Sequence, residues 1–323
     1  MENTTEKTIN TQYHDKLGVG LYHLDPRWSS MYDFKRVSGY GMVNAYRLTT
    51  EAGEGSFIKG CKFAMETGAQ IWYSAPTFIS ANETLEEFMA ALDKKVNNIK
   101  KAGVWDAVVG FQWDEPLLKK GHTNEDFLAM TKAISEAYGK RIFPVFSMYE
   151  IVGKRGNIGD PDFQWLLKKE SSKYITDVAF DVYGYDFRGE LRDDTKARLK
   201  HHYNIDFKTA EEILQFYTDR MLDLMENPDD VRVWYFPCAY LCRLWEGGPL
   251  ADEDFCIQSL EGYKNLLLKQ KNPGGLFSYG FKSWGEHNHL DWWVDEDNPD
   301  MWKRYVEAAK NVCDEIKDIK IKL

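Results

Sequence analysis

The stretch from Asp106 to Pro116, Asp-Ala-Val-Val-Gly-Phe-Gln-Trp-Asp-Glu-Pro, runs from apolar residues into two adjacent acids and a proline. An apolar run of this length predicts a strand buried on both faces, as in parallel sheets. Pro116 cannot donate to a sheet and favours an extended Glu115, so we expect the strand to end at the acids. Because α/β proteins place catalytic groups at carboxyl ends of parallel strands, Asp114 and Glu115 are candidate catalytic residues. The simpler alternative is a solvated strand end in which Asp114 caps a turn.

Eight segments of strand character alternate with helical ones along the chain. The predicted strands are 17–25, 41–48, 69–75, 106–115, 141–150, 175–185, 231–240 and 274–284. The predicted helices are 56–67, 84–102, 124–138, 160–172, 209–226, 252–269 and 300–319. Thr84 and Glu87 match a capping box at the start of one helix, and Asn124 is the expected cap of the next.

This alternation predicts right-handed crossovers between parallel strands. Eight such units in a chain of 323 residues are typical of a single-domain (β/α)₈ TIM barrel, here over residues 16–323. A doubly wound open sheet is the alternative. It is disfavoured because Gly18 and Gly20 lie inside the first strand and no glycine-rich phosphate loop follows them.

Composition restricts the classes of ligand. The net charge of −10 argues against a general nucleic-acid binder, which needs a basic surface. No apolar run approaches the roughly 18 residues of a membrane helix, so we expect no membrane partner. The same charge favours a soluble protein with a neutral or locally selected ligand. Aromatic residues make up 15% of the chain and include 11 tryptophans. Composition leaves the oligomeric state open.

The cysteines and the N-terminal segment point to a reducing compartment. Five cysteines without a Cys-x-x-Cys pair support neither a disulfide framework nor a zinc ribbon. Cys238 and Cys242 are interpreted as buried thiols, with metal ligation as the alternative. Residues 1–15 form a polar tail without the apolar core of a signal peptide, so we expect a cytoplasmic protein, or a secreted one if a signal peptide has been removed.

Aromatic and acidic residues gather at the predicted carboxyl ends of the strands, which share one mouth in a barrel. Each aromatic residue alone is more simply explained as core or rim filling, but their coincidence favours a carbohydrate site, where rings stack on sugars and carboxylates bind hydroxyls. The expected substrate-binding residues are Tyr22, His23, Trp72, Tyr73, Trp113, Tyr149, Tyr183, Tyr185, Asp186, Tyr240, Trp284 and Glu286.

With these residues the chain resembles the (β/α)₈ glycoside hydrolases. Glu115 matches the acid/base carboxylate at the end of their fourth strand, and Trp284 matches the tryptophan that forms the floor of many of their sugar sites. The chain departs from the retaining enzymes with two glutamates, because Asp114 stands where they have asparagine and the seventh strand ends without an acid. The chitinase pattern of alternating aspartates is also absent, because Phe111 and Trp113 occupy those positions.

The adjacent Asp-Glu pair is similar to that of substrate-assisted N-acetylhexosaminidases, an exception to the two-carboxylate scheme. The resemblance implies that Glu115 protonates the leaving oxygen and that Asp114 orients the 2-acetamido group of the substrate. It also implies that Tyr183 or Tyr185 donates a hydrogen bond to the acetamide oxygen. No cofactor is implied.

A two-carboxylate glycosidase is the first alternative, with a second acid about 5 Å away in retaining enzymes and about 6.5–9.5 Å away in inverting ones. Asp181 is a catalytic candidate because it shares a strand face with Tyr183 and Tyr185, although a buried structural acid is an equal interpretation. The other candidates are Asp186 and two acids expected on loops, Glu150 and Glu286.

Two other classes of protein remain open from the sequence. A non-catalytic carbohydrate-binding barrel would keep the aromatic residues, and a metal-dependent hydrolase would use the His287 and His289 pair, although we expect no metal. The charged segment 186–207 is either a solvated helical excursion or a loop that binds an acidic sugar through its basic residues. Further stacking surface is expected from Trp245, Trp292 and Trp293.

Overall fold

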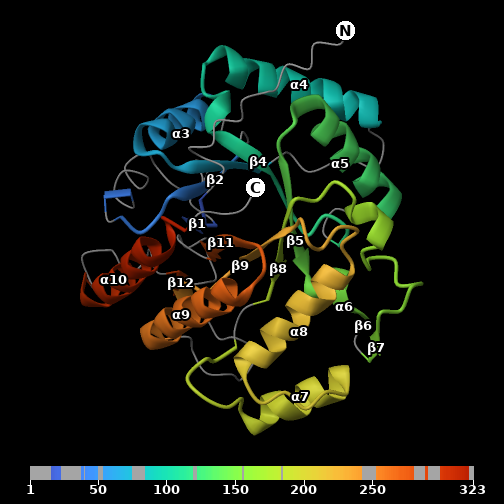
Figure 1. Ribbon diagram of the computed structural model, residues 1–323, viewed down its shortest axis with the longest axis vertical. Coiled ribbons are helices and arrows are strands. Elements are labelled where there is room, and N and C mark those ends of the chain that lie inside the picture. Colours follow the sequence, from blue (N-terminus) through green and yellow to red (C-terminus); the bar gives the residue numbers. More distant parts are fainter. Residues whose placement is uncertain are drawn as a thin grey trace.

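Eight parallel strands close into a barrel with helices around it (Figure 1). The computed structural model describes residues 16–22, 38–39, 41–49, 54–74, 84–118, 122–154, 156–182, 185–241, 252–279, 288–289 and 299–319. Around the barrel the strands follow the order β1-β11-β9-β8-β5-β4-β3-β2. The predicted single-domain (β/α)₈ barrel is confirmed, and closure of the sheet excludes a doubly wound open sheet.

All eight barrel strands overlap the segments predicted from the sequence. They are β1 (Gly18–Leu21), β2 (Ala45–Thr49), β3 (Gln70–Ser74), β4 (Val108–Asp114), β5 (Arg141–Ser147), β8 (Asp177–Asp181), β9 (Arg232–Tyr235) and β11 (Pro273–Ser278). Two short antiparallel pairs of strands lie outside the barrel, β6 (Gly153–Lys154) with β7 (Asn157–Ile158) and β10 (Tyr240–Leu241) with β12 (Asn288–His289).

The long helices match their predicted segments. They are α3 (Glu54–Thr67), α4 (Leu85–Lys101), α5 (Asn124–Tyr138), α8 (Ala210–Asp223), α9 (Glu253–Lys269) and α10 (Pro299–Ile316). Thr84 and Glu87 form the predicted capping box of α4. Asn124 is not a cap, however, because Thr123 caps α5 and the side chain of Asn124 binds a neighbouring loop instead.

The connection after β5 differs from its prediction. A helix was expected over 160–172, but the chain forms the short α6 (Met148–Val152), a series of turns, and the 3₁₀ turn η2 (Lys169–Ser172). The predicted strand 141–150 accordingly ends at Ser147, which is the N-cap of α6. The connection after β8 contains α7 (Asp193–Tyr203).

Large aromatic side chains fill the middle of the barrel. Trp72 contacts Phe143 and Trp234, with ring centroids 4.9 and 5.3 Å apart, and Trp234 stacks on Phe277 at 5.3 Å. Inward-facing glycines leave room for these rings, since a Cβ atom on Gly18 would lie 2.4 Å from the Trp234 ring. Within the described ranges, no helix is both long and apolar enough to span a membrane.

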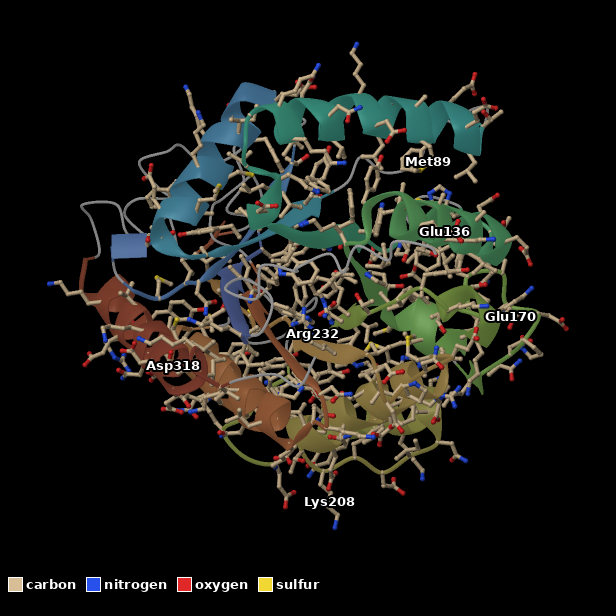
Figure 2. The ribbon with its side chains drawn as sticks, turned by 45° about the horizontal axis from the view of Figure 1, so that its top comes forward. Met89, Glu136, Glu170, Lys208, Arg232 and Asp318 are labelled. Atoms are coloured by element: carbon tan, nitrogen blue, oxygen red, sulfur yellow. The ribbon has the colours of Figure 1, made fainter. Side chains whose placement is uncertain are left out.

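A buried ionic cluster occupies the amino-terminal end of the barrel. Asp177 of β8 accepts hydrogen bonds from Arg232 Nε at 2.6 Å and Trp234 Nε1 at 2.8 Å, and it also pairs with Arg141. Burial opposes ionisation of Asp177, but the two arginine charges outweigh it and lower its pKa. Burial lowers the pKa of Arg232 to about 10, which keeps it charged at neutral pH. Figure 2 shows Arg232 near the middle of the molecule.

Candidate active site at the barrel mouth

Glu115 leaves the end of β4 in an unusual backbone conformation. Its φ angle is 45°, whereas Pro116 predicted an extended residue, so this expectation was wrong. Among the described non-glycine residues only Glu115 and Asn204 have a positive φ. The amide of Glu115 donates to the carbonyl oxygen of Val145 at 2.7 Å, and the residue is only 9% exposed. Non-glycine residues held in this region are typical of functional sites.

Asp114 belongs to a hydrogen-bonded network inside the barrel mouth. The hydroxyl of Tyr22, at the end of β1, donates to Asp114 Oδ1 at 2.8 Å and accepts from Gln112 Nε2 at 3.2 Å. Arg47 of β2 donates from Nε to Gln112 Oε1 at 2.6 Å, and its guanidinium lies 4.3 Å from the centroid of the Tyr22 ring. Burial raises the pKa of Tyr22 well above its usual value, so the tyrosine stays protonated and donates to Asp114.

Glu150 supports the loop that carries the acids. It is fully buried in α6, which corrects the expectation of a solvated loop residue. Its Oε1 accepts from the amides of Leu117 and Leu118 at 2.7 and 3.0 Å, and its Oε2 accepts from the amide of Ser147 at 2.6 Å. Burial raises the pKa of Glu150 to about 7, although these hydrogen bonds act in the opposite direction. The carboxylate therefore ties the chain after Glu115 to the end of β5.

The two expected second carboxylates have different surroundings. Asp181 ends β8 and follows Asp177 and Ala179 on the inward face, so it points towards the mouth. Asp186 is bound by Arg188 Nη2 at 2.7 Å, and the same guanidinium reaches Asp252, the N-cap of α9, at 3.3 Å. Burial opposes ionisation of Asp186, but hydrogen bonds from Arg188 lower its pKa.

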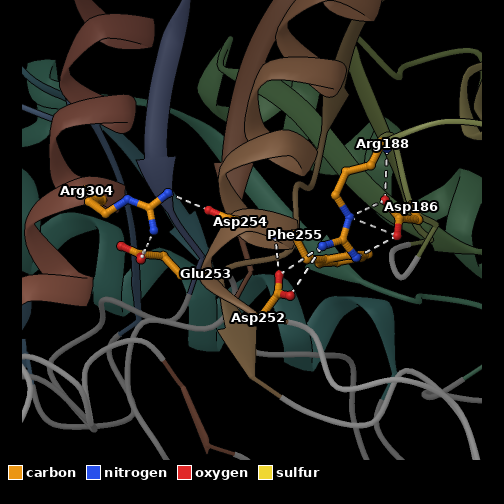
Figure 3. Close-up of polar contacts among 7 residues, drawn as sticks. All are labelled: Asp186, Arg188, Asp252, Glu253, Asp254, Phe255 and Arg304. Atoms are coloured by element: carbon orange, nitrogen blue, oxygen red, sulfur yellow. Dashed lines mark hydrogen bonds and ion pairs between the residues drawn. The ribbon is translucent and has the colours of Figure 1, made fainter.

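The surroundings of Asp186 are those of a structural anchor. Figure 3 shows Arg188 between Asp186 and Asp252, and beside it Arg304 of α10 against Glu253 and Asp254 in the first turn of α9. These contacts join the chain after β8 to α9 and α10. Asp186 therefore anchors this connection, and its contact with substrate stays a prediction.

Three of the expected sugar-stacking residues lie away from the mouth. Trp72 belongs to the aromatic layer inside the barrel, one inward position below Ser74. Tyr73 and Trp113 are buried between the barrel and its helices, where they pack near Phe111. These positions correct the expectation that the three rings contact substrate. Trp72 lies too deep inside the barrel, and Tyr73 and Trp113 lie on the outward faces of their strands.

Tyr185 also faces outwards. β8 ends at Asp181, so the strand alternation used to place Tyr185 does not continue to it, and the ring packs on the outer core and bonds to Tyr217. Tyr149 is half-buried in the first turn of α6. The remaining expected side chains lie outside the described residues: His23, Tyr183, Tyr240, Trp245, Trp284, Glu286, His287, His289, Trp292 and Trp293.

Sequence reasoning missed two residues of the mouth, Gln112 and Tyr279. Gln112 lies two positions before Asp114 on the inward face of β4, and this alternation could have identified it. Tyr279, directly after β11, stacks on Tyr22 with ring centroids 5.8 Å apart. Glu150 was a candidate second carboxylate, but its bonds to the amides of Leu117 and Leu118 are distant in the sequence and were not predicted.

The basic residues of segment 186–207 pair mostly with nearby acids. Lys196 contacts Glu190 and Lys200 contacts Asp206, each at 2.7 Å, and Arg192 contacts Asp194 at 3.1 Å. With α7 in its middle, the segment fits the solvated helical excursion. Cys238 is buried as expected, and Cys242 lies outside the described residues. No group of three potential metal ligands occurs among the side chains that the structure describes.

Comparisons with known proteins support the fold. No protein-family model matches the chain, and no curated protein matches it in sequence. Solved structures do match. A β-glucuronidase from Ruminococcus gnavus has a TM-score of 0.57 at 13% identity, covering 93% of this chain and 50% of that one. An exo-β-1,4-mannosidase from Opitutaceae bacterium strain TAV5 has a TM-score of 0.55 at 12% identity, covering 95% and 63%.

A β-1,4-mannanase matches over 91% of this chain and 99% of its own, with a TM-score of 0.50 at 8% identity. The chain spans about half the length of the glucuronidase structures. At these identities the matches establish the barrel fold that the chain shares with enzymes acting on carbohydrates.

Proposed function

We propose that the chain is a glycoside hydrolase with Glu115 as its general acid/base. The observation that carries this proposal is the backbone of Glu115, which is held in the left-handed region at the carboxyl end of a barrel strand. A general acid must be fixed within hydrogen-bond reach of the leaving oxygen. The bond to Val145 and the clamp of Glu150 on Leu117 and Leu118 provide this rigidity.

The surroundings of Glu115 also suit proton transfer. The residue is largely shielded from water, so its carboxyl group can meet the leaving oxygen of a bound substrate with little competing solvent. The solved structures with this barrel add support, since those discussed above are named as a glucuronidase, a mannosidase and a mannanase.

For the second catalytic group we propose Asp114, acting on a 2-acetamido group of the substrate. In this mechanism the aspartate orients the acetamide, whose oxygen attacks the anomeric carbon while Glu115 protonates the leaving oxygen. The Tyr22 hydroxyl donates to Asp114 Oδ1 at 2.8 Å and so fixes the orientation of this carboxyl group.

Asp181 supports an alternative mechanism with two separate carboxylates. One strand, β5, separates β8 from β4, and Asp181 and Asp114 end these two strands on the inward face of the barrel. An inverting mechanism requires the carboxylate of Asp181 about 6.5–9.5 Å from that of Glu115. In this case water, and not an acetamido group, is the nucleophile.

A panel of aryl glycosides, with and without a 2-acetamido group, tests the proposal. We expect Glu115→Gln to lower kcat on any cleaved substrate by about 10²–10⁴-fold. Cleavage confined to acetamido sugars, with a similar loss in Asp114→Asn, supports substrate assistance. Cleavage of plain glycosides with loss in Asp181→Asn supports two carboxylates. Undiminished activity in Glu115→Gln would overturn the proposal, and chelator-sensitive activity would favour a metal-dependent hydrolase.

A further inference from the structure

A groove of about 480 Å³ lies between the amino-terminal end of α5 and the loop before η2. Its lining includes Asn124, Glu125, Phe163, Gln164, Trp165 and Lys168. α5 follows β4 and this loop follows β5, so both belong to the face of the barrel on which Glu115 lies. The volume falls in the range of small-molecule sites.

The floor of the groove is fixed by hydrogen bonds. Asn124, only 4% exposed, donates from Nδ2 to the carbonyl oxygen of Leu166 at 2.9 Å and accepts at Oδ1 from the amide of Lys168 at 2.8 Å. The amide of Leu167 donates to the backbone oxygen of Glu150 at 2.8 Å. Glu150 thus joins the groove on one side to the loop after Glu115 on the other.

Two aromatic rings stand on a turn at one wall of the groove. Phe163 and Trp165 are half-buried and pack edge to face, with centroids 5.4 Å apart. The turn is held by Asp160, whose carbonyl oxygen accepts from the amide of Phe163 at 3.1 Å, and by the bond from Leu166 N to the Phe163 oxygen at 2.9 Å. The rings are therefore presented by fixed backbone.

The groove carries charges of both signs, and its lining also includes Asp162 and His122. Lys168 Nζ lies 3.4 Å from Glu125 Oε1, so the ammonium and the carboxylate largely compensate each other. The exposed amide of Gln164 supplies a donor and an acceptor. Apolar ring faces beside both donors and acceptors suit a neutral polyhydroxylated ligand, which has C–H faces and hydroxyl groups but no charge.

We propose that this groove is a second carbohydrate-binding site, which holds the part of a neutral oligosaccharide beyond the bond that is cleaved. The position of the groove relative to the cleaved bond rests on the proposed function. Binding of an oligosaccharide to the groove does not, because it can be measured without hydrolysis.

Calorimetric titration of the Glu115→Gln chain with mannohexaose, cellohexaose and the hexamer of N-acetylglucosamine tests the groove. We expect at least one oligosaccharide to bind, and Trp165→Ala in the same background to raise its Kd about tenfold or more. Trp165→Phe keeps an aromatic ring and should cost less affinity. It also provides the test if the alanine variant fails to fold.

Tyr174→Ala is the matched control, since Tyr174 is also a half-buried aromatic residue but precedes β8 at the other end of the barrel. Absence of binding, or equal Kd values for the Trp165 and Tyr174 variants, would overturn the groove proposal. Hydrolysis of the aryl glycoside panel tests Glu115 separately. Binding without any hydrolysis would support the groove proposal and contradict the proposed glycoside hydrolase activity. Hydrolysis without an effect of the Trp165 variants on Kd would support the activity and contradict the groove proposal.

Discussion

Glu115 shows how far a single residue can be predicted from its neighbours. The sequence placed an acid at the end of β4 correctly, but Pro116 predicted the wrong backbone conformation. A left-handed non-glycine residue costs about 1–3 kcal/mol. The bonds that offset this cost come from Val145 and Glu150, which are distant in the sequence, so no local pattern reveals them.

We predict that Tyr22→Phe impairs catalysis through Asp114. The variant removes the hydroxyl that donates to Asp114 and accepts from Gln112, which should lower stability by about 1 kcal/mol and kcat by about tenfold or more. Tyr138→Phe is the control, because its hydroxyl makes a similar bond to Asp93 at 2.7 Å in the helical layer. An equal effect of both variants on kcat would refute a role for Tyr22 in the site.

We predict that the protonation of Glu150 makes the stability of the protein depend on pH. Its folded pKa of about 7 lies above the ordinary value of 4.5, so the folded state binds the proton more tightly than the unfolded state. Stability from this group is therefore full below pH 4.5 and is lost as the pH rises towards 7, by about 3 kcal/mol in all.

Urea unfolding of the wild type and Glu150→Gln between pH 4 and pH 8 measures this term. The glutamine variant should lack this pH dependence. It should also be less stable at pH 4.5 by about 1–3 kcal/mol, because the amide nitrogen that replaces Oε2 cannot accept the hydrogen bond from Ser147 N. A wild type and variant with parallel pH profiles would contradict the assignment.

At the scale of elements, the strands were predictable because their apolar runs reflect burial on both faces. The failure over 160–172 has a physical cause. This segment is fixed by contacts with the first turn of α5, through Asn124, and with Glu150, and not by its own helical periodicity. Asn124 was misread as a cap for the same reason.

Close packing of the barrel strands should make the protein sensitive to a methyl group added at a glycine. A Cβ atom on Gly20 would lie 2.4 Å from the Phe277 ring and 2.6 Å from the carbonyl oxygen of Ala45, so Gly20→Ala should cost about 1–3 kcal/mol. Gly55, in the first turn of α3, has open space around it, and Gly55→Ala should leave stability equal or slightly higher. Thermal unfolding of both variants checks this, and equal melting temperatures would contradict close packing at Gly20.

At the scale of the whole molecule, the ends of the barrel differ in kind. The amino-terminal end is closed by the ion cluster of Asp177, Arg141 and Arg232, and the carboxyl end holds the network of Tyr22 and Asp114. We expect Asp177→Asn to destabilise the protein by about 3–5 kcal/mol, since it leaves buried arginines without their counter-charge.

The stabilising effect of Asp177 also has a pH signature. Because its folded pKa is lowered, its contribution is present above the ordinary pKa of 3.8 and is lost as the pH falls below it. Denaturant titrations at pH 7 and pH 3 should show a smaller gap between wild type and Asp177→Asn at the lower pH. A constant gap would contradict this account.

The closed barrel also explains which aromatic predictions failed. The sequence pattern placed many aromatic residues near strand ends. Which face of the sheet each ring occupies is determined only when the sheet closes into a barrel. Tyr73 and Trp113 follow the outward alternation and fill the space under the helices, whereas Tyr22 and Tyr279 face inwards at the mouth. The sequence thus predicted the architecture and the acidic strand end, and left the inward network to the structure.

The most direct test of the central claim compares two leaving groups on the sugar that the aryl glycoside panel identifies. A general acid matters for a phenyl leaving group and little for 2,4-dinitrophenyl, which departs without a proton. We predict that Glu115→Ala loses about 10²–10⁴-fold in rate on the phenyl glycoside and far less on the dinitrophenyl glycoside. Equal losses on both substrates, or none on either, would contradict the assignment of Glu115 as the proton donor.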